Sequence, residues 1–265
     1  MRQRSDLIYV YDGSYEGFLC CVFEAFLAKE RPFDILTEDR LEPTLFSVKW
    51  ITTDYTKAVR VIRGFEKRLR SDSIYLIENG LYCCCDKIEL IMLDFIVFAF
   101  DHGRSSASAL GSSEVNELQK AVLALKREAH SFIEFIRFSE YDGGLVSVIE
   151  PKNKVLPTIA PHFCDRFPNE LFLIYDKTHK SALIHKGGRC VIADNVEDFA
   201  EPQPGAEELF YRELWGSYFD AISIKERENP VCQRTHLPIR YRRHMTEFVR
   251  DAAAAANETA LKKLN

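Results

Sequence analysis

Residues 115 to 138 contain a change of hydrophobic period, and this change limits the folds open to the chain more than any other feature. Apolar residues first recur at spacings of three and four, which places them on one face of a long helix: they are Val115, Leu118, Val122, Leu125, Ala129, Phe132 and Ile136. From Phe138 onward the period is two, and FIRFSE and GLVSVIE flank the sequence Tyr-Asp-Gly-Gly. Because glycine tolerates the positive φ of tight turns, this pattern predicts a β-hairpin. The chain must therefore combine helices with a sheet.

The sequence after this hairpin continues the mixed pattern. Residues 154–167, KVLPTIAPHFCDRF, have apolar side chains at helical spacing. Three apolar runs follow, ELFLIYD, SALIHK and RCVIA, and the turns between them, at 177–180 and 187–188, are short enough to join antiparallel strands. Helices are predicted again at about 206–224 and from Pro238 to the end. This half is expected to form a small antiparallel sheet with an inserted helix, closed by C-terminal helices.

The first half of the chain is expected to be mainly helical, with one or two strands. LIYVY at 7–11 and LFSVKWI at 45–51 are strand candidates, and Thr52-Thr53-Asp54 is a candidate cap for the helix after the second. Residues 74–100 predict two buried helices, and the small polar run at 105–113 predicts a loop. The fold class is therefore α+β. We expect a helix-rich part at 1–112 and an α+β part at 113–265, packed together as one unit.

Composition indicates a cytoplasmic protein. The chain has 265 residues, is 46% hydrophobic and contains eight cysteines. The opening residues lack the order of a secretion signal, so these thiols are expected to be reduced. The most apolar stretch, at 91–100, contains Asp94 and falls short of the roughly 20 residues that a membrane-spanning helix needs. We expect no membrane contact.

A basic segment near the C-terminus is the main candidate site. Residues 229–245, NPVCQRTHLPIRYRRHM, hold four arginines and no acid in a chain of net charge −5. If a helix starts at Pro238, Tyr241, Met245 and Phe248 form its buried face. The arginines then spread over the remaining surface, an arrangement that suits several phosphates better than one small anion: they are Arg234, Arg240, Arg242 and Arg243. The alternative is a solvated basic face neutralised by the chain's own acids, such as Glu226, Glu228 or Asp220, and the charge pattern alone does not decide between them.

A second cationic pair lies in the predicted inserted helix. His162 and Arg166 are one helical turn apart, beside aromatic residues, and could hold a phosphate or a carboxylate. A solvated helix edge explains the same pattern. Arg166 is therefore added to the candidate nucleic-acid contacts with this alternative left open.

Candidate acid/base residues are His130, His162 and Glu128. Glu128 and His130 are two positions apart on the long helix, so they project about 200° from each other and cannot form a dyad together. Each would need a partner from elsewhere, and Asp176 is one further carboxylate that could contribute. Hydrogen bonding along the helix flank is the alternative for both.

The sequence contains only weak motifs for a metal site or for a phosphate-binding loop. Cys83, Cys84 and Cys85 are adjacent but lack a CxxC pair, and we favour buried thiols that pack as small hydrophobes. His130, His162 and His185 have no ligand spacing. Asp12-Gly13-Ser14 lacks the Gly-Lys-Ser/Thr ending of a phosphate loop, which favours a turn with a serine or aspartate cap. No metal and no other cofactor is predicted.

Sequence blocks along nearly the whole chain resemble a bacterial family, domain of unknown function 4130. The blocks are YVYDGSYEGFLCCVFEAF, ITTDYTKAVRV, REAHSFIEFIRF, IEPKNKVLPTIAPHFCDRFP, LFLIYD, ELWGSYFDAISIKERENP and LPIRYRRHMTEF. The resemblance implies a role in DNA metabolism or repair beside a radical-SAM partner, and related chains look fused to a domain like uracil-DNA glycosylase. That domain and the radical-SAM cysteine motif are both absent here, so neither chemistry can be assigned to this chain.

Three functions remain open. The favoured hypothesis is an accessory protein of DNA repair or modification that binds DNA, or the DNA-acting radical-SAM partner, through the basic segment. The first alternative is an enzyme acting on a nucleotide or a damaged base, with His130 or His162 as the acid or base. The second is an adaptor that docks the partner without touching DNA. The sequence does not decide whether the chain is an enzyme, which reaction or DNA structure is involved, or the oligomeric state.

Overall fold

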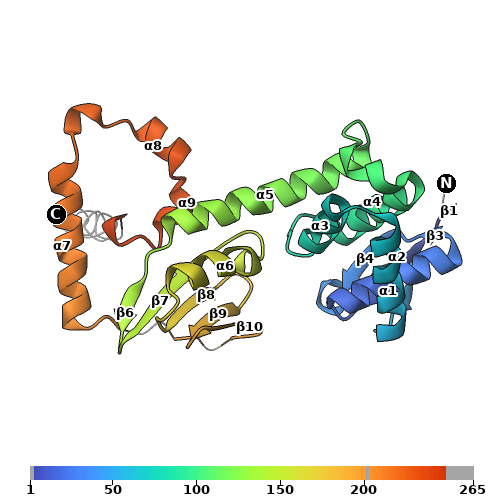
Figure 1. The fold of residues 1–265 in the computed structure, drawn as a ribbon, viewed down its shortest axis with the longest axis horizontal. Coiled ribbons are helices and arrows are strands. Elements are labelled where there is room, and N and C mark those ends of the chain that lie inside the picture. The colour runs from blue at the N-terminus through green and yellow to red at the C-terminus, as the bar shows by residue number, and fades with distance from the viewer. Residues whose placement is uncertain (1–2, 198, 201–202, 249–265) are drawn as a thin grey trace. The chain divides into compact units, whose positions relative to one another are not determined.

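The computed structural model describes residues 3–197, 199–200 and 203–248 (Figure 1). The chain divides into two compact units, Met1–Leu125 and Lys126–Asn265. Both combine helices with strands, which confirms the α+β class. The division falls inside α5 (Ser113–Phe135), after the loop at which the sequence suggested a boundary.

The first unit is built around a three-stranded parallel sheet. Its strand order is β4 (Asp34–Thr37), β2 (Leu7–Tyr11), β5 (Ser47–Trp50). Tyr9 and Val10 of the central strand are fully buried. A second parallel pair joins β1 (Gln3–Arg4) to β3 (Glu30–Arg31). The sequence predicted only one or two strands here, because β1 and β3 are too short to display a period of two and the residues of β4, DILT, do not alternate.

Helices cover this sheet. They are α1 (Tyr15–Ala28), α2 (Tyr55–Arg68), α3 (Ser71–Gly80) and α4 (Ile88–His102), with the short 3-10 helices η1 (Glu38–Arg40) and η2 (Gly103–Ser108). Two predicted caps are confirmed. The Ser14 hydroxyl accepts from the Gly17 N–H at the start of α1, and the Asp54 carboxylate accepts from the Thr56 N–H at the start of α2. The two helices expected within 74–100 are α3 and α4.

The long helix predicted from the spacing of three and four is α5. Each of its predicted apolar positions within Ser113–Phe135 is buried, while Ile136 follows the helix and is half-buried. Period alone therefore located both the helix and its buried face.

The second unit contains a five-stranded sheet, in the order β10-β9-β8-β7-β6. Its strands are β6 (Ser139–Tyr141), β7 (Gly144–Ile149), β8 (Phe172–Asp176), β9 (Ser181–Lys186) and β10 (Arg189–Ala193). The predicted hairpin is β6–β7, with Asp142 and Gly143 at positive φ in its turn. The three predicted meander strands, β8 to β10, pair antiparallel.

One strand pair differs from the expected antiparallel sheet. β7 and β8 are parallel, because α6 (Leu156–Arg166) carries the chain back to the edge where β7 began. α6 packs against β9 and β10 (Figure 1). The sheet is therefore mixed, and the carboxyl ends of β7 and β8 meet at one edge.

The C-terminal helices are α7 (Ala206–Ile222), η3 (Lys225–Arg227), α8 (Pro230–His236) and α9 (Ile239–Arg242). Asn229 caps α8, and Pro230 occupies its first turn. The helix expected from Pro238 onward is described only as the short α9, and residues 249–265 lie outside the described part of the chain. Among the described residues, no helix is both long enough and apolar enough to cross a membrane.

Candidate nucleic-acid interface

Two lysine-bearing loops lie side by side at the carboxyl edge of β7 and β8. Ile149 pairs with Asp176 at the strand ends, and the Lys177 N–H donates to the Ile149 carbonyl at 3.0 Å. The loop after β7 carries Lys152 and Lys154, and the turn after β8 carries Lys177 and Lys180. All four lysines are exposed. The sequence analysis did not select them, although lysines that follow two strands joined by a helix must share an edge.

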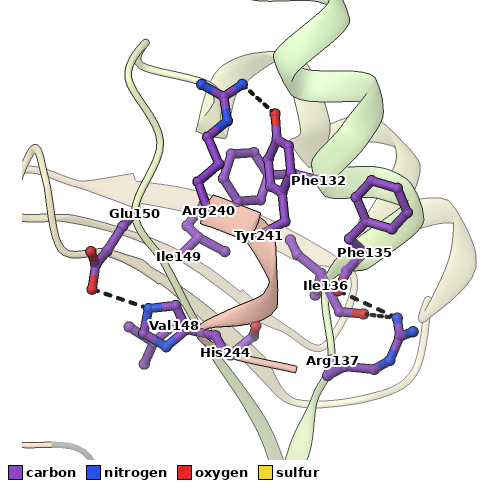
Figure 2. A pocket seen from close by; sticks show the side chains of 11 residues that line it. Phe132, Phe135, Ile136, Arg137, Val148, Ile149, Glu150, Arg240, Tyr241 and His244 are labelled. Atoms are coloured by element: carbon purple, nitrogen blue, oxygen red, sulfur yellow. Dashed lines mark hydrogen bonds and ion pairs between the residues drawn. The ribbon is translucent and has the colours of Figure 1, made fainter. Parts of the chain in front are cut away.

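The predicted basic segment is anchored in the same unit. Tyr241 is buried, with its ring 5.0 Å from Phe132 and 5.6 Å from Phe135 between centroids (Figure 2). Met245 is also buried and Phe248 is half-buried. Tyr241 and Met245 are therefore buried as predicted, whereas Phe248 is only half-buried, and Tyr241 packs on the last turns of α5.

Arg137 provides a second anchor. Its guanidinium donates to the carbonyls of Phe135 and Ile136, both at 3.3 Å, at the C-terminal end of α5 (Figure 2). Its other terminal nitrogen donates to Glu247 Oε1 at 2.9 Å, and that carboxylate is 3% exposed. The segment that carries Arg240 and Arg243 is therefore fixed near its start by Tyr241 and near its end by Glu247.

Glu150, the first residue after β7, joins the basic segment to the strand edge. Arg243 donates to Glu150 Oε2 at 2.5 Å, the ring of His244 lies 3.1 Å from Oε1 (Figure 2), and the Lys177 ammonium lies 3.7 Å from Oε1. Burial raises the pKa of Glu150, but the hydrogen bond from His244 and the charge of Arg243 outweigh it, so the pKa lies below its ordinary value. One carboxylate therefore gathers positive groups from two segments.

Glu128 on α5 makes the second connection. Its buried carboxylate accepts from the N–H groups of Lys152 at 3.0 Å and Asn153 at 2.9 Å, and from Asn153 Nδ2 at 2.7 Å. Arg240 Nη2 lies 3.4 Å from the same carboxylate and donates to the Tyr241 hydroxyl at 2.6 Å. These bonds place Lys152 beside Arg240. Glu128, a candidate acid or base, therefore holds the loop after β7 in place.

We call the resulting surface the basic edge. It consists of Lys152, Lys154, Lys177, Lys180, Arg240 and Arg243. The acids within it or paired to it are Glu128, Glu150, Asp176 and Glu197. Among these described residues, the six cations outnumber the four acids by two, whereas the whole chain carries −5. The basic edge is a local positive region on an acidic protein.

The other predicted arginines lie differently. Arg242 is half-buried, donates to the Leu237 carbonyl at 3.3 Å and lies over the Phe248 ring. Arg234 is exposed in the last turn of α8. Arg166 is exposed in the last turn of α6. Because α6 runs from the edge with the lysine loops back to the start of β8, Arg166 lies at the opposite edge of the sheet. Only Arg240 and Arg243 belong to the basic edge.

The acids that pair with this segment also differ from those that the sequence suggested. They are Glu128 and Glu150, rather than Glu226, Glu228 or Asp220. Arg240 keeps 42% of its side chain exposed and Arg243 keeps 70%. The guanidinium groups are therefore oriented by internal carboxylates while still facing solvent.

The candidate catalytic residues are not brought together. His130 is 74% exposed and lies 3.4 Å from Glu134 on the same helix, whereas Glu128 is buried on the opposite flank. His162 is exposed on α6 with its ring edge-on to Phe163. The sequence missed a closer pair, in which His179 Nδ1 lies 2.6 Å from the fully buried carboxylate of Asp176. That carboxylate also accepts from the N–H groups of Thr178 and His179, so it shapes the turn after β8.

The cysteine run lies in the connection between α3 and α4, not on a helix. Cys83 is buried and burial raises the pKa of its thiol to about 12, but Cys84 and Cys85 are exposed. The expectation of three buried thiols is therefore wrong for two of them, because a turn does not place successive residues in one core. Among the described residues, no group of three metal-ligating side chains converges.

A protein family matches a large part of the chain. Among curated proteins no relative is found. The family described as Domain of unknown function (DUF4130) matches residues 86–247, which is more than half of the chain and contains the whole basic edge with its anchors. The chain therefore belongs to the DUF4130 family.

Proposed function

We propose that the protein binds nucleic acid through the basic edge, as an accessory protein of DNA repair or modification. The observation that carries this proposal is the pair of connections made by Glu128 and Glu150, which set arginines of the C-terminal segment beside lysines of two separate loops. Positive charges spread along an edge match the repeated charges of a phosphate backbone.

The ion pairs within the basic edge are compatible with this role. A guanidinium has five N–H donors, so the bond from Arg243 to Glu150 leaves donors for a phosphate. Exposed ion pairs contribute little to stability, about 0–1 kcal/mol, so a polyanion can compete with them at small cost. Because the whole chain is acidic, affinity must come from this local surface and must be sensitive to salt.

A role in DNA repair beside a radical-SAM partner is a separate part of the proposal. It rests on the family resemblance of the sequence blocks, whereas the basic edge supports only affinity for a polyanion. We propose that the protein brings such a partner to DNA, so that the chemistry belongs to the partner.

The test compares two double variants that remove the same charge from opposite edges of one sheet. Lys152→Ala with Lys177→Ala changes the basic edge, and Lys186→Ala with Arg189→Ala changes exposed cations at the other edge. Affinities for single-stranded, duplex and uracil-containing DNA are measured over a range of salt concentrations. On duplex DNA, the slope of log affinity against log salt should fall by about 0.9 for each phosphate that the variant no longer neutralises.

We expect the first double variant to bind all sequences more weakly and with a lower slope, and the second to behave as the wild type. Arg166→Ala is a separate arm, because it asks whether the interface extends to the far end of α6. Equal slopes for the two double variants, in folded proteins, would remove the basic edge from the proposal.

A further inference from the structure

An apolar groove lies on the first unit, far in sequence from the basic edge. It encloses about 310 Å³ between α1 and α2, with one residue of α4 in its wall. Its lining is Val22, Phe23, Phe26, Leu27, Arg60, Val61, Gly64 and Phe100. Arg60 is the only charged side chain among these, and the volume equals that of two or three large apolar side chains of a partner.

The shape of the groove follows from its residues. Leu27 stands at the rim with 68% of its surface exposed, although burial is the usual state of leucine. Gly64 lets the Phe100 ring lie close against α2, because a Cβ there would lie only 3.2 Å from that ring. The walls are helices, whose side chains repeat at spacings of three and four, and the same spacing on an incoming helix fits such a groove.

The rim of the groove is basic. Among the cations of helix α2, Arg60 lines the groove and Arg68 contacts its Phe100 wall, whereas Arg63 lies outside the lining and Lys57 is paired with Glu24 of α1. Arg60 lies over the Phe23 ring at 5.6 Å and Arg68 over the Phe100 ring at 5.5 Å. An occupant must therefore present an apolar face bordered by negative charge.

These observations favour a protein segment over a nucleic acid. Stacking of nucleobases needs open ring faces, but cations already lie over the rings of Phe23 and Phe100. Of the remaining lining, Phe26 packs against the Phe100 ring, and Val22, Leu27 and Val61 are aliphatic, which suits leucine-like side chains. We propose that the groove between α1 and α2 binds an amphipathic helix of a partner protein, with acidic residues flanking its apolar face.

The experiment uses the full chain and two labelled helical peptides of about 16 residues, long enough for three or four apolar positions on one face. Both carry the same leucine and phenylalanine face, and they differ only in flanks of glutamate or of lysine. Fluorescence anisotropy measures their binding. We expect the glutamate peptide to bind saturably and at least about tenfold more tightly than the lysine peptide.

Matched variants locate the binding. Arg60→Glu should weaken the glutamate peptide at least about fivefold and strengthen the lysine peptide, whereas Arg63→Glu, one turn away on α2 and outside the groove, should change little. Leu27→Ser should weaken both peptides, and Leu110→Ser, an equally exposed leucine elsewhere, should weaken neither. Both leucines are exposed, so the fold should tolerate their replacement.

Equal binding of the two peptides, or equal effects of Arg60→Glu and Arg63→Glu, would overturn the proposal. Displacement of the glutamate peptide by a single-stranded oligonucleotide, together with abolished oligonucleotide binding in Arg60→Glu, would show instead that the groove is a nucleic-acid site. The variants of the basic edge leave this groove intact, so this test is independent of the DNA-binding proposal.

Discussion

Glu128 and Arg240 lie 112 positions apart in the sequence, and the carboxylate of one is 3.4 Å from the guanidinium of the other. The same carboxylate holds the N–H groups of Lys152 and Asn153. One buried acid thus ties α5, the loop after β7 and the C-terminal segment into one arrangement. The basic edge depends on this arrangement, because no single segment supplies all of its charges.

Replacement of Glu128 by alanine should destabilise the second unit by about 3 kcal/mol. The change leaves two loop N–H groups and one guanidinium without their buried acceptor, which costs more than removing one exposed ion pair. Urea unfolding measures the difference. Glu134→Ala is the control on the same helix, since Glu134 is 52% exposed and forms an ion pair with the exposed His130. Its cost should stay below about 0.5 kcal/mol. Equal costs for the two variants would contradict the role given to Glu128.

Two substitutions at Tyr241 should separate packing from hydrogen bonding. Tyr241→Ala removes a buried ring that contacts Phe132 and Phe135, and should cost about 3–5 kcal/mol. Tyr241→Phe removes only the hydroxyl that accepts from Arg240, and should cost about 1 kcal/mol. Thermal unfolding tests both. If the segment does not pack on α5 in solution, both variants should unfold like the wild type.

The predicted elements that the structure confirms are those with a strong local signal. The period of three and four located α5 and its buried face, and Tyr-Asp-Gly-Gly located the hairpin turn. Strands β1 and β3 were missed because two residues are too few for a period to appear, and β4 was missed because its residues, DILT, do not alternate between apolar and polar. The parallel pairing of β7 and β8 was missed because the direction of pairing depends on where α6 returns the chain.

The candidate site was also predicted only in part, because only some of its residues give a local signal in the sequence. Charge composition pointed to Arg240 and Arg243, and apolar spacing pointed to Tyr241 and Met245 as the buried face that presents them. The lysine loops and the pairing acids were not predictable from spacing. They come near the arginines only through pairings between residues about 90 or more positions apart, such as Arg243 with Glu150, and a single sequence contains no signal for such pairings.

In the first unit, Glu24 should contribute stability that depends on pH. Its carboxylate accepts from Lys57 at 2.8 Å and from Lys49 at 3.2 Å, which joins α1 to α2 and β5. The hydrogen bond from Lys57, opposed by burial and aided by Lys49, lowers the pKa of Glu24 below its ordinary value of 4.5. The folded protein therefore binds this proton less readily than the unfolded chain, so the stabilisation is present above pH 4.5 and disappears as the pH falls through the lower, folded pKa.

Glu24→Gln measures this contribution. The variant should be less stable than the wild type by about 0.5–1 kcal/mol near neutral pH, because the lysine partners are partly exposed. The difference should shrink at acid pH, where the wild-type carboxylate becomes neutral as well. Urea unfolding at several pH values supplies the comparison, and a difference that stays constant across them would exclude the proposed linkage.

Glu150→Gln should strengthen DNA binding if the basic edge is the interface. The carboxylate of Glu150 lies among Arg243, His244 and Lys177, so its removal raises the local charge by one and frees their donors for phosphates. We expect affinity to rise several-fold at low salt and the gain to fall as screening increases. Glu170→Gln makes the same charge change at an exposed residue two positions before β8, at the opposite edge of the sheet, and should have a smaller effect. The two variants carry the same net charge, so any difference between them reports position alone. Equal gains would mean that only overall charge matters, and weaker binding by Glu150→Gln would mean that its carboxylate orients the arginine in a way that DNA binding requires.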